Sequence, residues 1–102
     1  MTSRTERVTT LHPAGKNGVR IERSKYDGMR RALLRVIPRS EKGVAFRELR
    51  ELVRPHLDPQ IFDASTSVSW YVTTVKQDLE ARGLVRQLPG RGPQRLQRVR
   101  AA

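Results

Sequence analysis

Arginine side chains dominate the C-terminal end of the chain, where their spacing is suited to holding phosphate groups. Residues 81–102 contain six arginines and no acidic residue. A guanidinium group stays charged and can donate two parallel hydrogen bonds to a phosphate. Arg91 stands between two glycines, so nothing bulky blocks its approach to a groove or a phosphate backbone. We expect phosphate contacts from Arg86, Arg91, Arg95 and Arg98. A solvated basic hairpin without a partner is the alternative.

Polar side chains recur at helical spacing in the segment that precedes these arginines. Glutamine can pair with adenine through two hydrogen bonds, and serine, threonine and lysine can reach bases or phosphates. If residues 66–82 form a helix, its polar side predicts base or groove contacts from Ser69, Thr73, Lys76 and Gln77. Residues 55–80 carry one lysine and four acidic residues, however, a local charge of −3. A solvated helix face that touches no nucleic acid therefore stays open.

Trp70 is the single tryptophan of the chain and falls on this polar side. It could pack against the N-terminal arm or against residues 19–22, because tryptophan is mostly buried in folded proteins. It could also anchor a dimer or another protein, or stack on a sugar or base. We keep it as a possible interaction anchor.

No arrangement of residues predicts catalysis or metal binding. The chain has no cysteine, and neither His12 nor His56 has a carboxylate or a second histidine at metal-ligand spacing. The serines at 65, 67 and 69 form no nucleophile motif. Residues 89–93 read as a turn, because they lack the glycine spacing and the lysine of a nucleotide-binding loop. We expect no enzyme, no cofactor, no metal and no identifiable small-molecule ligand.

Composition favours one small basic domain with a polyanionic partner. The chain has 102 residues and a formal net charge of +11 at pH 7. Such a charge attracts nucleic acid most readily, so double-stranded DNA is the expected partner. No apolar run is long enough to span a bilayer, and the first residues lack the apolar stretch of a secretory signal. We expect no membrane contact and a cytoplasmic, nucleoid-associated location.

The first part of the chain predicts an arm, a short strand and a helix. Residues 1–18 show no apolar period, so we interpret them as a flexible basic arm before a single domain over residues 19–102. Residues 18–23 alternate apolar and charged side chains, the pattern of a short strand that could pair with the C-terminal sheet or lead into the helix. Ser24 is the expected cap of that helix, and Pro38 ends it. Its buried stripe comprises Tyr26, Met29, Leu33, Val36 and Ile37.

The second part predicts two more helices and a hairpin. A short strand or extended entry is expected over 43–46, helices over 46–57 and 66–82, strands over 84–88 and 94–99, and a turn over 89–93. Asp63 or Ser65 is the expected cap of the last helix, and Gly83 its C-terminal stop. The apolar face of the 46–57 helix is Phe46, Leu49, Leu52, Val53 and Leu57, and that of the 66–82 helix is Val68, Val72, Val75 and Leu79.

One sequence motif adds a family resemblance. The run VKQDLEARGLVR, residues 75–86, resembles the end of the recognition helix and the first wing strand of bacterial winged-helix proteins. With Phe46-Arg-Glu-Leu49 opening the second helix, the resemblance covers about residues 24–100, and it looks most like a small uncharacterised bacterial family. It implies an α+β fold, a three-helix winged helix-turn-helix with a small antiparallel sheet. In such a fold Leu79 would anchor the recognition helix and Leu84 and Val85 would begin the wing.

The sequence therefore leads us to expect a DNA-binding protein, a transcriptional regulator or a nucleoid-associated factor. A regulator of genes would be expected to act as a homodimer. Two other classes stay open. One is a protein-interaction or dimerisation module that uses the Trp70 face, which the negative charge of residues 55–80 favours. The other is a small RNA-binding protein, although five aromatic residues leave little for base stacking.

Overall fold

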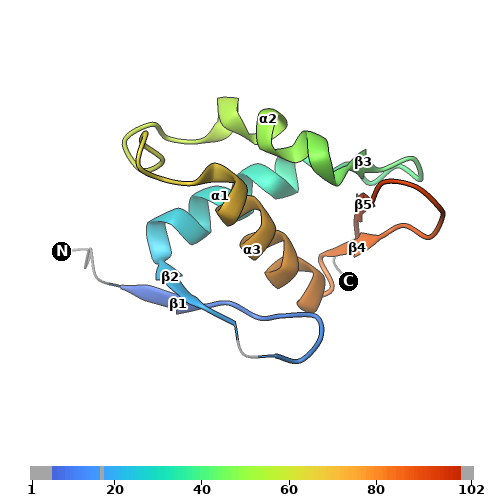
Figure 1. Cartoon of the computed structure of the whole chain (residues 1–102), viewed down its shortest axis with the longest axis horizontal. Helices are drawn as coiled ribbons and strands as arrows, with labels where there is room; N and C mark the ends of the chain where they lie inside the picture. Colours follow the sequence, from blue (N-terminus) through green and yellow to red (C-terminus); the bar gives the residue numbers. More distant parts are fainter. Residues whose placement is uncertain (1–5, 17, 100–102) are drawn as a thin grey trace.

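Three helices and two small antiparallel sheets make up the part of the chain that the computed structural model describes, residues 6–16 and 18–99 (Figure 1). The elements are β1 (Arg7–Thr9), β2 (Arg20–Glu22), α1 (Arg23–Val36), β3 (Val44–Ala45), α2 (Leu49–Val53), α3 (Val68–Ala81), β4 (Val85–Gln87) and β5 (Arg95–Arg98). Single 3-10 turns extend α2 at both ends, over Phe46–Glu48 and Arg54–His56. The predicted α+β class is confirmed.

The C-terminal sheet has the strand order β3-β5-β4, so the last strand lies in the middle. Leu96 of β5 pairs with Val44 of β3, and Arg98 pairs with Val85 of β4, both in antiparallel register. The predicted hairpin over residues 84–99 is confirmed, and so is the short strand before α2. Gly83, which ends the turn out of α3, has a φ of 77°, a conformation that glycine adopts without strain.

The buried sides of the helices meet in one hydrophobic core. Met29 and Leu33 of α1 and Val75 and Leu79 of α3 are fully buried in it. Helical spacing places each pair on one side of its helix, so α1 and α3 pack directly against each other with their polar sides outward. The inner face of the C-terminal sheet adds Leu96, among others, to the same core.

Two details of the helical segments differ from the prediction. Leu52 is 40% exposed rather than buried, because the 100° step within α2 turns it away from Val53 to the edge of the apolar face. Ser24 does not cap α1, which begins at Arg23 directly after β2. The backbone amide of Arg23 donates to the carbonyl of Glu6, 2.9 Å away, so the neighbouring strand satisfies this helix start without a hydroxyl group.

The cap of α3 is also a different residue. The Ser67 hydroxyl accepts a hydrogen bond from the Trp70 amide at 3.2 Å. Asp63 instead accepts from the amide and hydroxyl of Ser65, at 2.9 and 2.6 Å, which holds the loop before α3. These hydrogen bonds hold the pKa of the Asp63 carboxyl below its usual value.

Residues 7–16 differ from the predicted flexible arm. Strand β1 pairs antiparallel with β2, with Val8 opposite Ile21, and Thr10 exchanges two hydrogen bonds with Val19 beyond the strands. Strand β2 therefore pairs with β1 and not with the C-terminal sheet. Strand β1 has only three residues, too few to show the alternation of apolar and polar side chains that predicts a strand. The sequence pattern therefore did not predict it. Residues 1–5 of the predicted arm lie outside the described residues.

Candidate functional site

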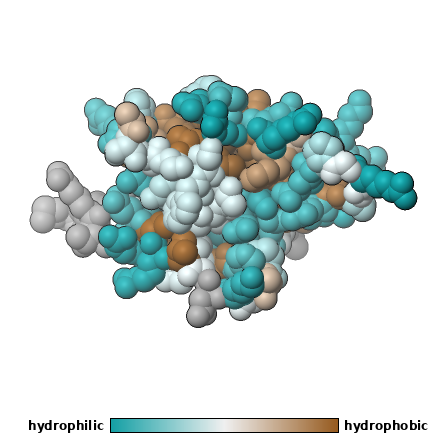
Figure 2. Space-filling view, viewed as in Figure 1, coloured by the Kyte–Doolittle hydropathy of each residue, from teal (hydrophilic) through white to brown (hydrophobic). Residues whose placement is uncertain are grey.

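The outward side of α3 is polar and carries no exposed carboxylate. Ser69 is exposed, Thr73 and Gln77 are half-buried, and Trp70 is 45% exposed. Figure 2 shows a pale, weakly polar surface near the centre of the molecule, where α3 lies in Figure 1, bordered by both hydrophilic and hydrophobic side chains. Three of the four residues predicted to reach a groove, Ser69, Thr73 and Gln77, therefore share one accessible surface.

Lys76 was predicted to join them, but the structure places its side chain elsewhere. Its side chain is buried, and its Nζ pairs with the Glu80 Oε1 at 2.8 Å. The same ammonium group lies 5.1 Å from the centre of the Phe46 ring. The 100° step of the helix turns Lys76 toward α2, where an aromatic ring and a carboxylate surround its charge. It cannot reach a phosphate from this position.

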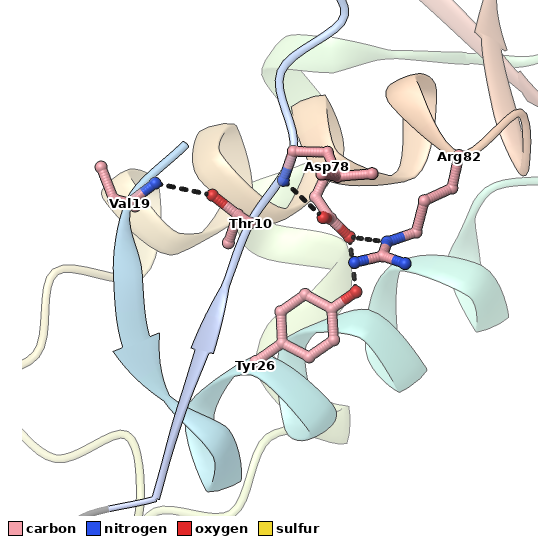
Figure 3. Close-up of polar contacts among 6 residues, drawn as sticks. Thr10, Val19, Tyr26, Asp78 and Arg82 are labelled. Atoms are coloured by element: carbon pink, nitrogen blue, oxygen red, sulfur yellow. Dashed lines mark hydrogen bonds and ion pairs between the residues drawn. The ribbon is translucent and has the colours of Figure 1, made fainter. Parts of the chain in front are cut away.

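The acidic residues near the end of α3 are paired and shielded from solvent. The Asp78 carboxylate is fully buried and accepts from the Leu11 amide at 2.8 Å, the Tyr26 hydroxyl at 2.5 Å and Arg82 Nε at 2.9 Å (Figure 3). Glu80 accepts from Lys76 and from Gln87 Nε2, each at 2.8 Å. Asp78 and Glu80 therefore add no free negative charge to α3, and the exposed acidic residues of the 55–80 stretch, Asp58 and Asp63, lie in the loop before it.

This buried carboxylate also raises the pKa of two neighbouring groups. Burial, together with the hydrogen bond to Asp78, raises the pKa of the Tyr26 hydroxyl above 10.0. The hydrogen bond to Asp78, together with the attraction of its charge, raises the pKa of Arg82 above its ordinary value. The network joins β1–β2, α1 and α3 (Figure 3), so it fixes the N-terminal hairpin on the end of α3.

The hairpin of β4 and β5 presents three of the four predicted arginines to solvent. Arg91 is exposed at the tip, between Gly90 and Gly92, which both have positive φ values. Arg86 Nε donates to the Gln97 side chain at 2.8 Å, and Arg95 Nε donates to the Lys42 carbonyl at 2.8 Å. None of the three makes an ion pair with another described residue, so their charges stay available.

Arg98 does not belong with them. It pairs with Val85 across the hairpin, and the Val85 side chain is buried, so Arg98 lies on the inner face of the sheet. Its side chain is half-buried, and its Nε lies 3.3 Å from the Ile37 carbonyl, to which it donates. A prediction from charge alone could not separate the two faces of the strand. Arg100, at the end of the same basic run, lies outside the described residues.

The sequence prediction missed a second row of arginines, which lies beside α3. Arg50 Nη1 donates to the Ser69 hydroxyl at 3.5 Å. A hollow of about 410 Å³ between the α2 segment and the loop that enters α3 is lined by Arg50, Arg54 and Asp63, among others. A second hollow, about 270 Å³, is lined by Arg47, Arg50 and Thr73, among others. The spacing of Arg47, Arg50 and Arg54, three and four residues apart, places them on one side of a helix. This row could therefore have been predicted from the sequence.

The site therefore consists of an uncharged polar helix face with arginines on two sides. Glu51 pairs with Arg50 and Arg54 at 3.5 Å each, so this row keeps only part of its charge. No three His, Cys, Asp or Glu side chains within residues 6–16 and 18–99 gather closely enough to hold a metal ion. None of the helices over the same ranges is long and apolar enough to cross a membrane.

Comparison with known proteins gives one match. No curated protein and no solved structure matches the chain. Residues 7–96 match the model of a family of unknown function (DUF6958), and this range begins at β1 and reaches into β5. The matched range includes the N-terminal hairpin, α3 and most of the basic hairpin. The chain belongs to this family of unknown function, DUF6958.

Proposed function

We propose that this domain is a winged helix-turn-helix that binds double-stranded DNA. The order helix, short strand, two helices, hairpin, with the short strand beside the last strand, supports this assignment. The observation that carries the proposal is the outward side of α3, polar and free of exposed carboxylates, with unpaired guanidinium groups beside it on the β4–β5 hairpin. A helix of this width fits the major groove of B-DNA.

In this proposal the arginines supply most of the affinity. Arg86, Arg91 and Arg95 contact the phosphates that flank the groove, and Arg47 and Arg50 contact phosphates on the other side of α3. Lys76 has no such role, because it is enclosed by Phe46 and Glu80. Arg98 adds to the long-range electrostatic attraction of DNA but touches no phosphate, since its guanidinium group faces the end of α1.

Ser69, Thr73 and Gln77 supply whatever sequence preference exists. Their hydroxyl and amide groups can donate to and accept from base edges. Arg50 donates to Ser69 and so orients a side chain that faces the groove. A homodimer on an inverted repeat would multiply this preference, and a transcriptional regulator or a nucleoid-associated factor in the cytoplasm is the cellular role that the proposal implies.

Selection of fragmented genomic DNA by the purified protein at about 150 mM salt tests the proposal, because contacts to phosphate alone weaken steeply with salt. We expect retained fragments. An enriched inverted repeat, lost in a T73A/Q77A variant, would assign sequence reading to α3. Retention without an enriched motif would assign the binding to the arginines. A wild-type protein that retains no DNA at this salt or at lower salt would overturn the proposal.

A second candidate function is a protein-interaction module. Trp70 favours it, because a 45% exposed tryptophan is available as an anchor, and its ring packs edge-on to Tyr71 with centroids 4.8 Å apart. A Trp70→Ala variant separates the two functions. If it loses an oligomer or a protein partner while its DNA affinity stays unchanged, Trp70 serves a protein contact. If its DNA affinity falls instead, Trp70 belongs to the DNA surface.

A further inference from the structure

The outward side of α1 carries a second group of unpaired arginines, far from the wing in the sequence. Arg31 and Arg35 are exposed, and neither makes an ion pair with another described residue. They are one helical turn apart, about 6 Å along the axis. Arg39 is also exposed, but its carbonyl accepts from Gln97 Nε2 of β5 at 2.7 Å, so it lies beside the β4–β5 hairpin rather than on α1. We call Arg31 and Arg35 the α1 surface.

The α1 surface and the outward side of α3 face opposite directions. Helix α1 buries Met29 and Leu33 in the core, and α3 buries Val75 and Leu79 in the same core. Each helix therefore turns its inner side toward the other and its polar side away from it. In Figure 1, α3 crosses in front of α1, which agrees with this arrangement. A duplex bound along α3 would leave the α1 surface free.

The surroundings of the α1 surface keep its positive charge. A hollow of about 290 Å³ is lined by Arg31 and Arg35 from α1 and by His56 and Asp58 from the far end of the α2 segment, among others. Asp58 is the carboxylate that faces this hollow, and its Oδ1 accepts from the Gln60 amide. Asp27, one turn before Arg31, is already paired with Arg23 at 3.4 Å.

The folded domain alone gives no reason for this arrangement. Like charges one turn apart destabilise a helix. Arg35 lies in the last turn of α1 and benefits from the helix dipole, but Arg31 lies too far from the helix end for that effect. Phosphate groups seated between the two guanidinium groups would remove their repulsion, and each strand of a duplex places one phosphate for about every 3.4 Å of helix axis.

We infer that the α1 surface binds the backbone of a second DNA duplex, so that one molecule holds two duplexes together. This inference rests on the proposed function, which supplies the first duplex. The second contact involves phosphates alone, because the α1 surface offers guanidinium groups and no outward row of amides or hydroxyls. It is therefore independent of sequence and sensitive to salt.

A co-capture experiment tests the inference. A biotinylated duplex on beads is incubated with the protein and with a fluorescent duplex, and the fluorescence retained on the beads is measured. An R31A/R35A variant removes the α1 surface. An R7A/R20A variant is the matched control, since it removes the same charge from exposed residues of the N-terminal hairpin. Unchanged thermal unfolding verifies that each variant is folded.

We expect wild type and control to retain the fluorescent duplex. The α1 variant should bind the bead-bound duplex within about twofold of wild type, yet retain at least about tenfold less of the second duplex. If the α1 variant retains the second duplex as well as wild type does, the bridging arises elsewhere, for instance in a dimer, and the inference is wrong. If that variant also loses the first duplex, the protein has one surface rather than two, which equally overturns it.

Two further results separate the inference from the proposed function. Wild-type protein that binds the bead-bound duplex but never retains the second one overturns the inference alone. Wild-type protein that binds neither duplex overturns the proposed function and the inference together.

Discussion

Asp78 near the end of α3 and Arg91 at the tip of the β4–β5 hairpin are both charged, yet their surroundings are opposite. Asp78 is fully buried and accepts hydrogen bonds from three donors on three different segments. Arg91 is exposed between two glycines and pairs with no carboxylate of the described residues. The difference extends to their neighbours, because Glu80 and Lys76 pair with each other, whereas Arg86 and Arg95 find only uncharged partners.

This contrast separates charge that stabilises the fold from charge that is available to a partner. A buried charge is tolerated only when it is paired and hydrogen-bonded, so the Asp78 network has a structural role. An exposed cation costs little to leave unpaired and attracts polyanions from a distance. Net charge summed along a stretch of sequence mixes the two kinds, which is why residues 55–80 looked acidic although the outward side of α3 is not.

Removal of the buried carboxylate should have the largest effect. We expect Asp78→Ala to lower the free energy of unfolding by about 3 kcal/mol, because it leaves the Tyr26 hydroxyl and the Leu11 amide without an acceptor. Urea denaturation measures this loss. Glu48→Ala is the control, since Glu48 is an exposed carboxylate without an ion pair among the described residues, and it should change stability by less than about 0.5 kcal/mol. Equal losses of stability in the two variants would contradict the structural role of the buried Asp78 carboxylate.

Substitution of the hairpin arginines should have the opposite result, a large loss of DNA affinity and no loss of stability. We expect R86A/R91A to weaken binding to a random-sequence duplex about tenfold or more at about 100 mM salt, because two phosphate contacts are lost. Fluorescence anisotropy measures the affinity, and thermal unfolding should be unchanged. Arg98→Ala is the matched comparison within the same hairpin and should weaken binding much less. If Arg98→Ala weakens binding as much as the double variant, the division between the two faces of β5 has no functional meaning.

The pH dependence of stability should sharpen the structural side of the comparison. The pKa of Tyr26 is raised above 10.0 in the folded protein by burial and by the hydrogen bond to Asp78. The stability that follows from this shift is therefore fully present below pH 10 and is lost as the pH rises through the folded value. We expect the free energy of unfolding to fall above about pH 10. In Tyr26→Phe this fall should be smaller, and an identical alkaline profile would show that Tyr26 is not its source.

Lys76 gives the smallest expected effect on binding. Because its ammonium group is enclosed by Glu80 and Phe46, we expect Lys76→Met to change DNA affinity by less than about twofold, despite the loss of a positive charge from α3. Gln77→Ala, one residue away on the outward side, serves as the comparison in the same anisotropy assay. A tenfold loss in Lys76→Met would mean that this side chain leaves its pocket to reach a phosphate, contrary to its burial.

Periodicity in the sequence was sufficient for most of the fold. The stripe of Val72, Val75 and Leu79, the stop at Gly83 and the alternation in the last two strands predicted α3 and the hairpin close to their observed bounds. Strand β1 could not be predicted this way, because its three residues show no alternation of apolar and polar side chains. Its partners in β2 also lie 11 or more positions away in the sequence. The cap of α3 was missed because Asp63, Ser65 and Ser67 are all plausible caps, and only the path of the chain selects Ser67.

The candidate site was less predictable because it depends on side-chain direction. Ser69, Thr73 and Gln77 were found from the helical step alone. Lys76 lies only 60° from the outward side, and its burial depends on Phe46 of another segment. The arginines of the α2 segment were overlooked because their closeness to α3 is a tertiary contact, which the Arg50–Ser69 hydrogen bond reveals.

The salt dependence of wild-type binding to a random-sequence duplex tests the central claim most directly. If exposed arginines hold the DNA backbone, the logarithm of the association constant should fall linearly with the logarithm of salt concentration between about 50 and 200 mM. The expected slope is about −4.5 for the five proposed phosphate contacts. Absence of binding at about 50 mM salt, or an affinity that does not change with salt, would contradict the account.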